Sequence, residues 1–195
     1  MPRAGLTPAV VTEEAARVSD EHGFAALSLA AVAKRLGVAV PSLYKHVHGL
    51  DGLRREVAIA SAREFGDVLG RAAIGRSGAD AVRSVAAAYR DWARAHPGRY
   101  AALNLAPDQN DEEAAKVFFT AVEVMVAIVR GFGIPEESVI DVIRTLRSAL
   151  HGFVDLETRG GFGLPQSVDT SFAVLLDGLV KALKNWPKPM DGMVD

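Results

Sequence analysis

The chain has 195 residues, a formal net charge of −2 and no cysteine, and 49% of its residues are hydrophobic. This length allows one or two domains with a sizeable core, and the hydrophobic content excludes a disordered chain. The absence of cysteine excludes disulfides and cysteine-ligated zinc, and it favours a cytoplasmic protein. No apolar run reaches about 18 residues and the N-terminus lacks the pattern of a signal peptide, so we expect neither a membrane span nor a leader.

Helical periodicity runs through the whole sequence and predicts an all-α fold. No alternating pattern favours a strand, and glycine and proline separate the helical segments. The predicted helices are 7–22, 29–36, 41–47, 51–72, 78–95, 98–105, 111–131, 136–160 and 168–185.

The segment from residue 28 to residue 47 has the pattern of two short helices joined by a tight turn. Ser28 stands where its hydroxyl can cap the first helix, and Gly37 follows that helix, where a left-handed conformation suits glycine. Pro41 fits the first turn of the second helix, on which Leu43 and Val47 can pack inward. This pattern is typical of a helix-turn-helix DNA-binding motif.

The same segment resembles the DNA-binding domain of the TetR family of transcriptional regulators. The string LGV followed by PSLYKHV is similar to that family's turn and recognition helix, and the similarity extends over about residues 6–60. The resemblance implies that the second helix enters the major groove of DNA. It places the DNA-binding residues at Ser28, Ala39, Val40, Pro41, Ser42, Tyr44, Lys45 and His46.

Roles within this set follow from the side-chain chemistry. Tyr44 and His46 are expected to bind phosphates, whereas Ser42 and Lys45 are candidates for base contacts. Each could instead be an ordinary surface residue, and Tyr44 could be a half-buried core aromatic. Polar groups for reading bases are few in this set.

Two features of the charge distribution bear on DNA binding. Residues 1–55 hold seven Lys or Arg against five Asp or Glu, so the basic excess of the predicted DNA-binding part is small. Leu50 stands where many members of the family have a lysine that binds phosphate. The sequence leaves open whether this contact is lost or is supplied by Arg54 or Arg55.

The second half of the chain resembles one subgroup of TetR-family C-terminal domains, the Trp-His-Gly type. The strings YRDWARAHPGRY, RSALHGF and GFGL, which lie within residues 89–164, carry this resemblance. It implies an all-α domain for ligand binding and dimerisation. We therefore expect a DNA-binding domain over residues 1–50 and a ligand-binding and dimerisation domain over residues 51–195.

The apolar stripes of segments 136–160 and 168–185 are broad for helices that pack on one side only. Burial against a second copy, in an isologous four-helix interface, is the favoured interpretation, although both stripes could fill the core of a single chain. The candidate interface residues are Leu146, Leu150, Phe153, Phe172, Leu176, Leu179 and Leu183.

Aromatic and polar residues of the second half are candidates for an effector pocket between helices. They are Tyr89, Trp92, Phe118, Met125, Arg147, His151 and Phe162. His151 is the strongest polar candidate, because a histidine on an apolar helix requires a hydrogen-bond partner. Each of these residues could also be a plain core residue.

The sequence contains no G-x-S-x-G, P-loop or H-E-x-x-H motif, so an enzyme is not expected, nor is a cofactor or metal. The helix-turn-helix pattern and the resemblance to the TetR family together imply a ligand-responsive transcriptional regulator that binds a palindromic double-stranded DNA operator as a homodimer. The favoured mode is a repressor that a small-molecule effector releases. The alternative is an all-α small-molecule-binding or scaffold protein that has lost DNA binding.

Overall fold

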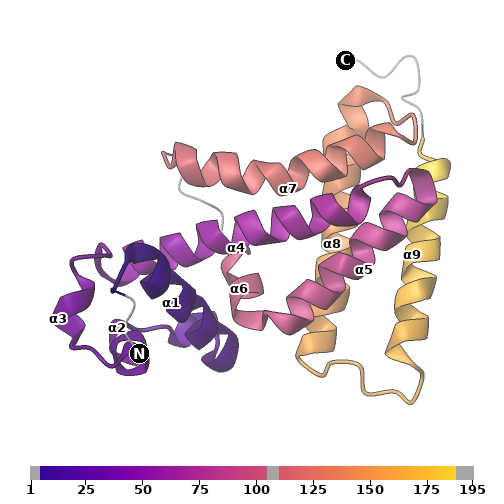
Figure 1. The fold of residues 1–195 in the computed structure, drawn as a ribbon. Helices are drawn as coiled ribbons and strands as arrows, with labels where there is room; N and C mark the ends of the chain where they lie inside the picture. Colours follow the sequence, from indigo (N-terminus) through magenta and orange to yellow (C-terminus); the bar gives the residue numbers. More distant parts are fainter. Residues whose placement is uncertain (1–4, 105–109, 188–195) are drawn as a thin grey trace, which may run out of the picture. The chain divides into compact units, whose positions relative to one another are not determined.

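A computed structural model describes residues 5–104 and 110–187 (Figure 1). Within these ranges the chain forms helices and short 3-10 turns and contains no strand, which confirms the all-α prediction. The helices are α1 (Pro8–His22), α2 (Leu29–Leu36), α3 (Val40–Leu43), α4 (Gly49–Ala73), α5 (Gly78–Ala95), α6 (Pro97–Ala102), α7 (Glu112–Arg130), α8 (Val139–Thr158) and α9 (Val168–Lys184); the 3-10 turns are Phe24–Ala26 and Glu136–Ser138.

The predicted helix over residues 41–47 is the element that differs most from its expected form. Its regular part, α3, ends at Leu43, and a looser turn follows. In this turn the amides of His46 and Val47 both donate to the carbonyl of Leu43, at 2.8 and 3.0 Å.

The chain folds into two compact units. Unit 1 consists of Met1–Phe65 and Ala95–Phe118, and unit 2 consists of Gly66–Arg94 and Phe119–Asp195. This division differs from the expected boundary at residue 50, because the first part of α4 and all of α6 belong with the N-terminal helices. The chain passes between the units within the continuous helices α4 and α7 and at the end of α5.

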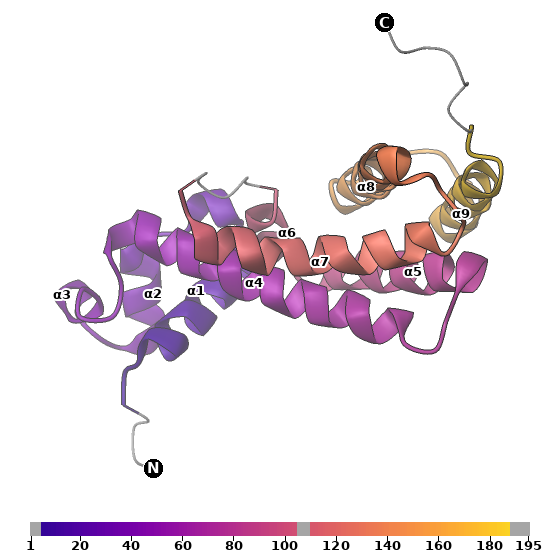
Figure 2. The same ribbon diagram turned by 90° about the horizontal axis from the view of Figure 1, so that it is seen from above.

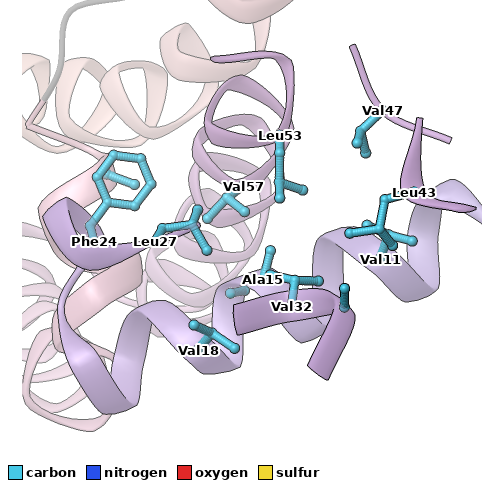
Figure 3. Packing of buried hydrophobic residues seen from close by; sticks show 13 residues of the cluster. Val11, Ala15, Val18, Phe24, Leu27, Val32, Leu43, Val47, Leu53 and Val57 are labelled. Atoms are coloured by element: carbon cyan, nitrogen blue, oxygen red, sulfur yellow. The ribbon is translucent and has the colours of Figure 1, made fainter. Parts of the chain in front are cut away.

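Unit 1 is built around an apolar core that fixes the orientation of α3 (Figure 3). Leu43 and Val47 are buried in this core, as predicted, together with Val32 of α2 and Leu53 of α4. Burial of each such side chain contributes about 1.5–3 kcal/mol relative to exposure. Since one side of α3 is held by these contacts, its opposite side faces solvent.

Helix α6 approaches α1 very closely at Gly98. A Cβ atom on this glycine would lie 2.0 Å from the backbone carbonyl carbon and oxygen of Ser19. Only hydrogen fits at this distance, so glycine is required for the two backbones to meet. The contact fixes α6 against α1, with which it packs along its length.

The residue after this glycine, Arg99, ties three helices of unit 1 together. Its guanidinium lies 3.1 Å from Glu13 and 3.0 Å from Asp20, both on α1, and 2.8 Å from Glu64 of α4. Its backbone amide also donates to Asp20, at 2.9 Å. Because Arg99 is buried, these carboxylates supply the charge compensation that its removal from water requires.

In unit 2, α8 and α9 run side by side (Figures 1 and 2), and an arginine of α5 fastens them. Arg90 donates to both carboxylate oxygens of Glu157, at 2.5 and 2.7 Å, and to Asp169 at 2.7 Å. Its guanidinium carbon lies 4.7 Å from the ring centroid of Phe172. Hydrogen bonds from Arg90 lower the pKa of the Glu157 carboxyl.

The approach at Gly98 predicts that Gly98→Ala destabilises unit 1 by at least about 2 kcal/mol, because the added methyl group overlaps the backbone of α1. Alanine is the better helix former by up to about 1 kcal/mol, so propensity alone predicts the opposite sign. Urea unfolding followed by circular dichroism measures the difference. The control is Gly163→Ala, in an exposed loop where a Cβ meets no atom within 4 Å. An unfolding free energy for Gly98→Ala equal to that of the control would contradict this account.

The Arg90 clamp predicts a pH-dependent contribution to stability. The folded pKa of Glu157 lies below its ordinary value of 4.5, so its contribution is present above pH 4.5 and is lost as the pH falls through the folded pKa. Glu157→Gln should lower the unfolding free energy by about 2 kcal/mol at neutral pH. The difference from the unchanged protein should shrink in acid. Glu137→Gln, at an exposed carboxylate, is the control, and a pH-independent difference for Glu157→Gln would refute the assignment.

Candidate nucleic-acid interface

Local hydrogen bonds form the turn between α2 and α3. The Ser28 hydroxyl accepts from the amide of Ala31 at 3.2 Å and caps α2. Gly37 adopts the left-handed conformation, with φ 68° and ψ 34°, at the end of that helix. The amide of Val38 then donates to the carbonyl of Ala33, at 3.0 Å, which closes the turn. These are the cap and turn that the sequence predicts, and they set the angle at which α3 leaves α2.

Arg35 holds α2 against α1. Its guanidinium lies 2.8 Å from the carboxylate of Glu14 and 2.5 Å from that of Glu21. The hydrogen bond from Arg35 lowers the pKa of Glu21, and the same bond raises the pKa of Arg35. Arg35 therefore contributes its charge to the contact between α1 and α2.

Of the predicted DNA-binding residues, Ser28 lies at the N-terminus of α2, and the others lie at the start of α3, on α3 and in the turn that follows it. Tyr44 is 60% exposed, which is inconsistent with the alternative of a half-buried core aromatic. Ala39, Pro41 and Lys45 are also exposed, whereas Ser28, Val40, Ser42 and His46 are partly buried. This surface therefore presents one long cation and two hydroxyl-bearing side chains next to each other along the chain.

Few cations of this region are free to meet a phosphate. Among the described residues, Lys34 and Lys45 have no acidic partner within ion-pair distance, and both are exposed. Arg54 lies 3.5 Å from the carbonyl of Ala25, to which it donates. Unit 1 thus contributes a modest positive charge to any phosphate contact.

Leu50, which stands where many family members have a phosphate-binding lysine, packs partly buried against the core of unit 1, which explains an apolar residue there. Arg55, one of the two arginines considered for that contact, donates to both oxygens of Asp111, at 2.5 and 2.8 Å, and to Glu113 at 2.8 Å. These hydrogen bonds and one from the amide of Ala114 lower the pKa of Asp111 to about 2. Sequence reasoning missed this pair, since its members are 56 residues apart.

The structure places the predicted pocket residues at different sites: Met125 lines an apolar cavity of unit 2, and Phe162 lines a separate pocket of about 360 Å³ within residues 161–171. Unit 2 contains an apolar cavity of about 10 Å³, and Met125 is the only pocket candidate among its lining residues. Tyr89 and Trp92 are buried in the core, His151 is partly buried and Arg147 is exposed. The Phe162 ring packs at a tilt of 44° against that of Phe153, with ring centroids 4.8 Å apart, and Phe118 belongs to unit 1.

The predicted interface residues lie mostly inside the chain's own core. The buried ones are Leu146, Leu150, Phe172, Leu176 and Leu183, and the partly buried ones are Phe153 and Leu179. Their stripes are broad because α8 and α9 pack on each other and also face the other helices around the cavity. The large apolar residues that α8 and α9 leave exposed are Ile140, Leu156 and Val174.

Two structural features are absent from residues 5–104 and 110–187. No helix there is long and apolar enough to cross a membrane. No group of three or more His, Asp or Glu side chains in the described ranges is placed to hold a metal ion.

Two family models match the chain. Residues 11–57 match the model of bacterial regulatory proteins of the tetR family, and residues 82–179 match a tetracyclin repressor-like C-terminal domain. The first match contains the α2–turn–α3 segment, and the second contains the core of unit 2.

Known proteins resemble the chain over nearly all its length. It is 33% identical to the uncharacterized HTH-type transcriptional regulator YobS of Bacillus subtilis (strain 168), covering 94% of this chain and 98% of that protein. The crystal structure of the putative regulatory protein SCO4313 has a TM-score of 0.72 at 25% identity, covering 89% of this chain and 95% of the other. The Streptomyces coelicolor TetR family protein ActR, in complex with (S)-DNPA, has a TM-score of 0.65 at 19% identity, covering 92% and 98%. The chain belongs to the TetR family of helix-turn-helix transcriptional regulators.

Proposed function

We propose that this regulator is a repressor that binds a palindromic operator as a homodimer and is released by a small-molecule effector. The observation that carries the proposal is the solvent-facing side of α3 and its following turn, held in place by the buried Leu43 and Val47. A rigid helix with exposed polar tips is what insertion into a major groove requires. Since its operator is DNA, the protein would act in the cytoplasm.

The exposed side chains suggest a division of roles at the DNA. Tyr44 and His46 would bind phosphates and set the register of α3 in the groove, with Lys34 as a further phosphate partner from α2. Lys45 and Ser42 would contact base edges, and the exposed ring of Pro41 could touch a thymine methyl group. With so few free cations, the affinity of one subunit would be low. Two subunits with their recognition helices roughly 34 Å apart would bind successive major grooves and raise it.

For the effector to release the protein from DNA, a change in unit 2 must alter the position of α3. Helix α6 of unit 1 follows α5 of unit 2 directly in the chain. Through the ion pairs of Arg99, α6 is joined to both α1 and α4, so a movement of α6 would be passed to these helices. A shift of α6 would then move α1, on which Arg35 holds α2. The small molecule bound to ActR supports a ligand as the trigger, by likeness of fold. Linkage makes the effect reciprocal, so DNA would weaken effector binding by the same factor.

Selection of bound fragments from random-sequence DNA tests the DNA-binding part of this proposal. We expect an enriched palindrome whose affinity falls about tenfold for Tyr44→Ala, since one phosphate hydrogen bond per subunit is lost. Lys34→Ala, which removes the proposed phosphate partner on α2, should reduce the slope of log affinity against log salt by about one per subunit. Lys184→Ala removes the same charge from the exposed end of α9 and should leave the slope unchanged. A chain that enriches no site at low salt would instead be the binding or scaffold protein.

The exposed sides of α8 and α9 are the proposed surface for a second copy. Val174 is 66% exposed and Leu156 is 50% exposed, and a Cβ built on Gly178 would meet open space. Gly178 lies one helical turn after Val174 on α9. Its missing side chain would let another helix approach closely and pack against Val174. An isologous contact of this kind would bury the apolar groups that the chain itself does not cover.

Val174→Arg should convert the dimer into a monomer, because burial of an unpaired guanidinium at the contact is unfavourable. Sedimentation equilibrium measures the molecular mass directly. Ile74→Arg is the matched control, since Ile74 is 73% exposed in the turn after α4 and should not lie at this contact. Dimers of unchanged affinity for both variants would exclude the α8–α9 surface.

A further inference from the structure

The apolar cavity of unit 2 that Met125 lines has no polar side chain in its lining. It lies where α5, α7, α8 and α9 meet, and each side chain around it is a hydrocarbon or a thioether. The lining residues are Val82, Val85, Ala86, Met125, Ile128, Leu146, Leu150, Leu176 and Leu179. With a volume of about 10 Å³, the cavity has room for no more than one water molecule.

We infer that this cavity marks the effector site, that its ligand is an uncharged apolar molecule, and that the ligand binds only an expanded packing of unit 2. This inference rests on the proposed function, which supplies the effector. It adds the chemical class of that effector and the physical reason why its binding alters the protein.

The chemical class follows from what the lining lacks. A ligand carboxylate or ammonium would leave water without gaining a hydrogen bond from the lining, which strongly disfavours its entry. Arg90, the buried cation among the described residues of unit 2, is already bound by Glu157 and Asp169. Arg147 is exposed on α8 and His151 is not among the lining residues. An apolar molecule gains by transfer from water and requires no such partner.

The need for expansion follows from the volume. A molecule larger than one water does not fit the packing described here, so it must bind a different packing. Met125 is the side chain best suited to move, because it is unbranched and only partly buried. Its neighbours Val122, Val124 and Val126 on α7 are also partly exposed, so this part of α7 is less firmly enclosed than α8. A ligand that binds one packing and not the other has the differential affinity that coupling to DNA requires.

The test uses N-phenyl-1-naphthylamine, an uncharged apolar fluorophore, with the full-length protein. Ala86→Leu fills the cavity and should weaken binding of the probe about tenfold, whereas Leu150→Ala enlarges it and should strengthen binding about threefold. Opposite signs separate a cavity effect from a loosened core, which would raise probe uptake in both variants. The controls are Ala87→Leu, at an exposed position on α5, and Ile74→Ala, at an exposed apolar residue in the turn after α4, and they should leave the affinity unchanged.

Competition against the bound probe tests the chemical class. Decan-1-ol should displace the probe, and decanoate at the same chain length should do so about tenfold less well, because its charge finds no partner. Equal displacement by both, equal affinity of Ala86→Leu and the unchanged protein, or no probe binding would overturn the inference. Operator binding is measured separately on the selected DNA fragment. Failure to bind that fragment would refute the proposed function and leave the cavity result standing. DNA binding without probe binding would refute the cavity inference and leave the proposed function standing.

Discussion

The close approach of α6 to α1 at Gly98 is the contact on which the arrangement of unit 1 depends. It lets the backbones meet and thereby places the next residue, Arg99, among carboxylates of α1 and α4. A buried guanidinium is stable only with such partners, so the ion pairs of Arg99 hold α1, α4 and α6 together. Helix α1, fixed in this way, holds α2 through Arg35, and the shared core holds α3. The orientation of the DNA-facing surface therefore depends on a helix that does not belong to the helix-turn-helix.

The same ion pairs limit the electrostatics of DNA binding. Arg35, Arg55 and Arg99 each bind carboxylates inside unit 1, and the lysines at positions 34 and 45 remain for phosphates or bases. Structural use of arginine thus leaves little charge for non-specific attraction to DNA. A regulator of this kind would depend on duplication of its binding surface by dimerisation and on the shape of its operator.

Unit 2 combines an apolar interior with one strongly paired cation. Arg90 joins α5 to the end of α8 and the start of α9, whereas the cavity between those helices has no polar partner to offer. Under the proposed function, an apolar ligand would change the packing on the α7 side of the cavity while Arg90 keeps the end of α8 and the start of α9 together.

The sequence by itself determined the helices, the caps at Ser28 and Gly37, the inward positions of Leu43 and Val47 and the helix-turn-helix, because these depend on interactions over three or four residues. Tertiary structure decided that α6 belongs to unit 1, that Arg55 binds Asp111, and that Leu146 and Leu176 face the chain's own core. Local periodicity marks a residue as apolar and on one side of a helix, but it does not say which neighbour covers that side. Pairs such as Arg99 and Glu13 are 86 residues apart, and only the crossing of helices brings them together.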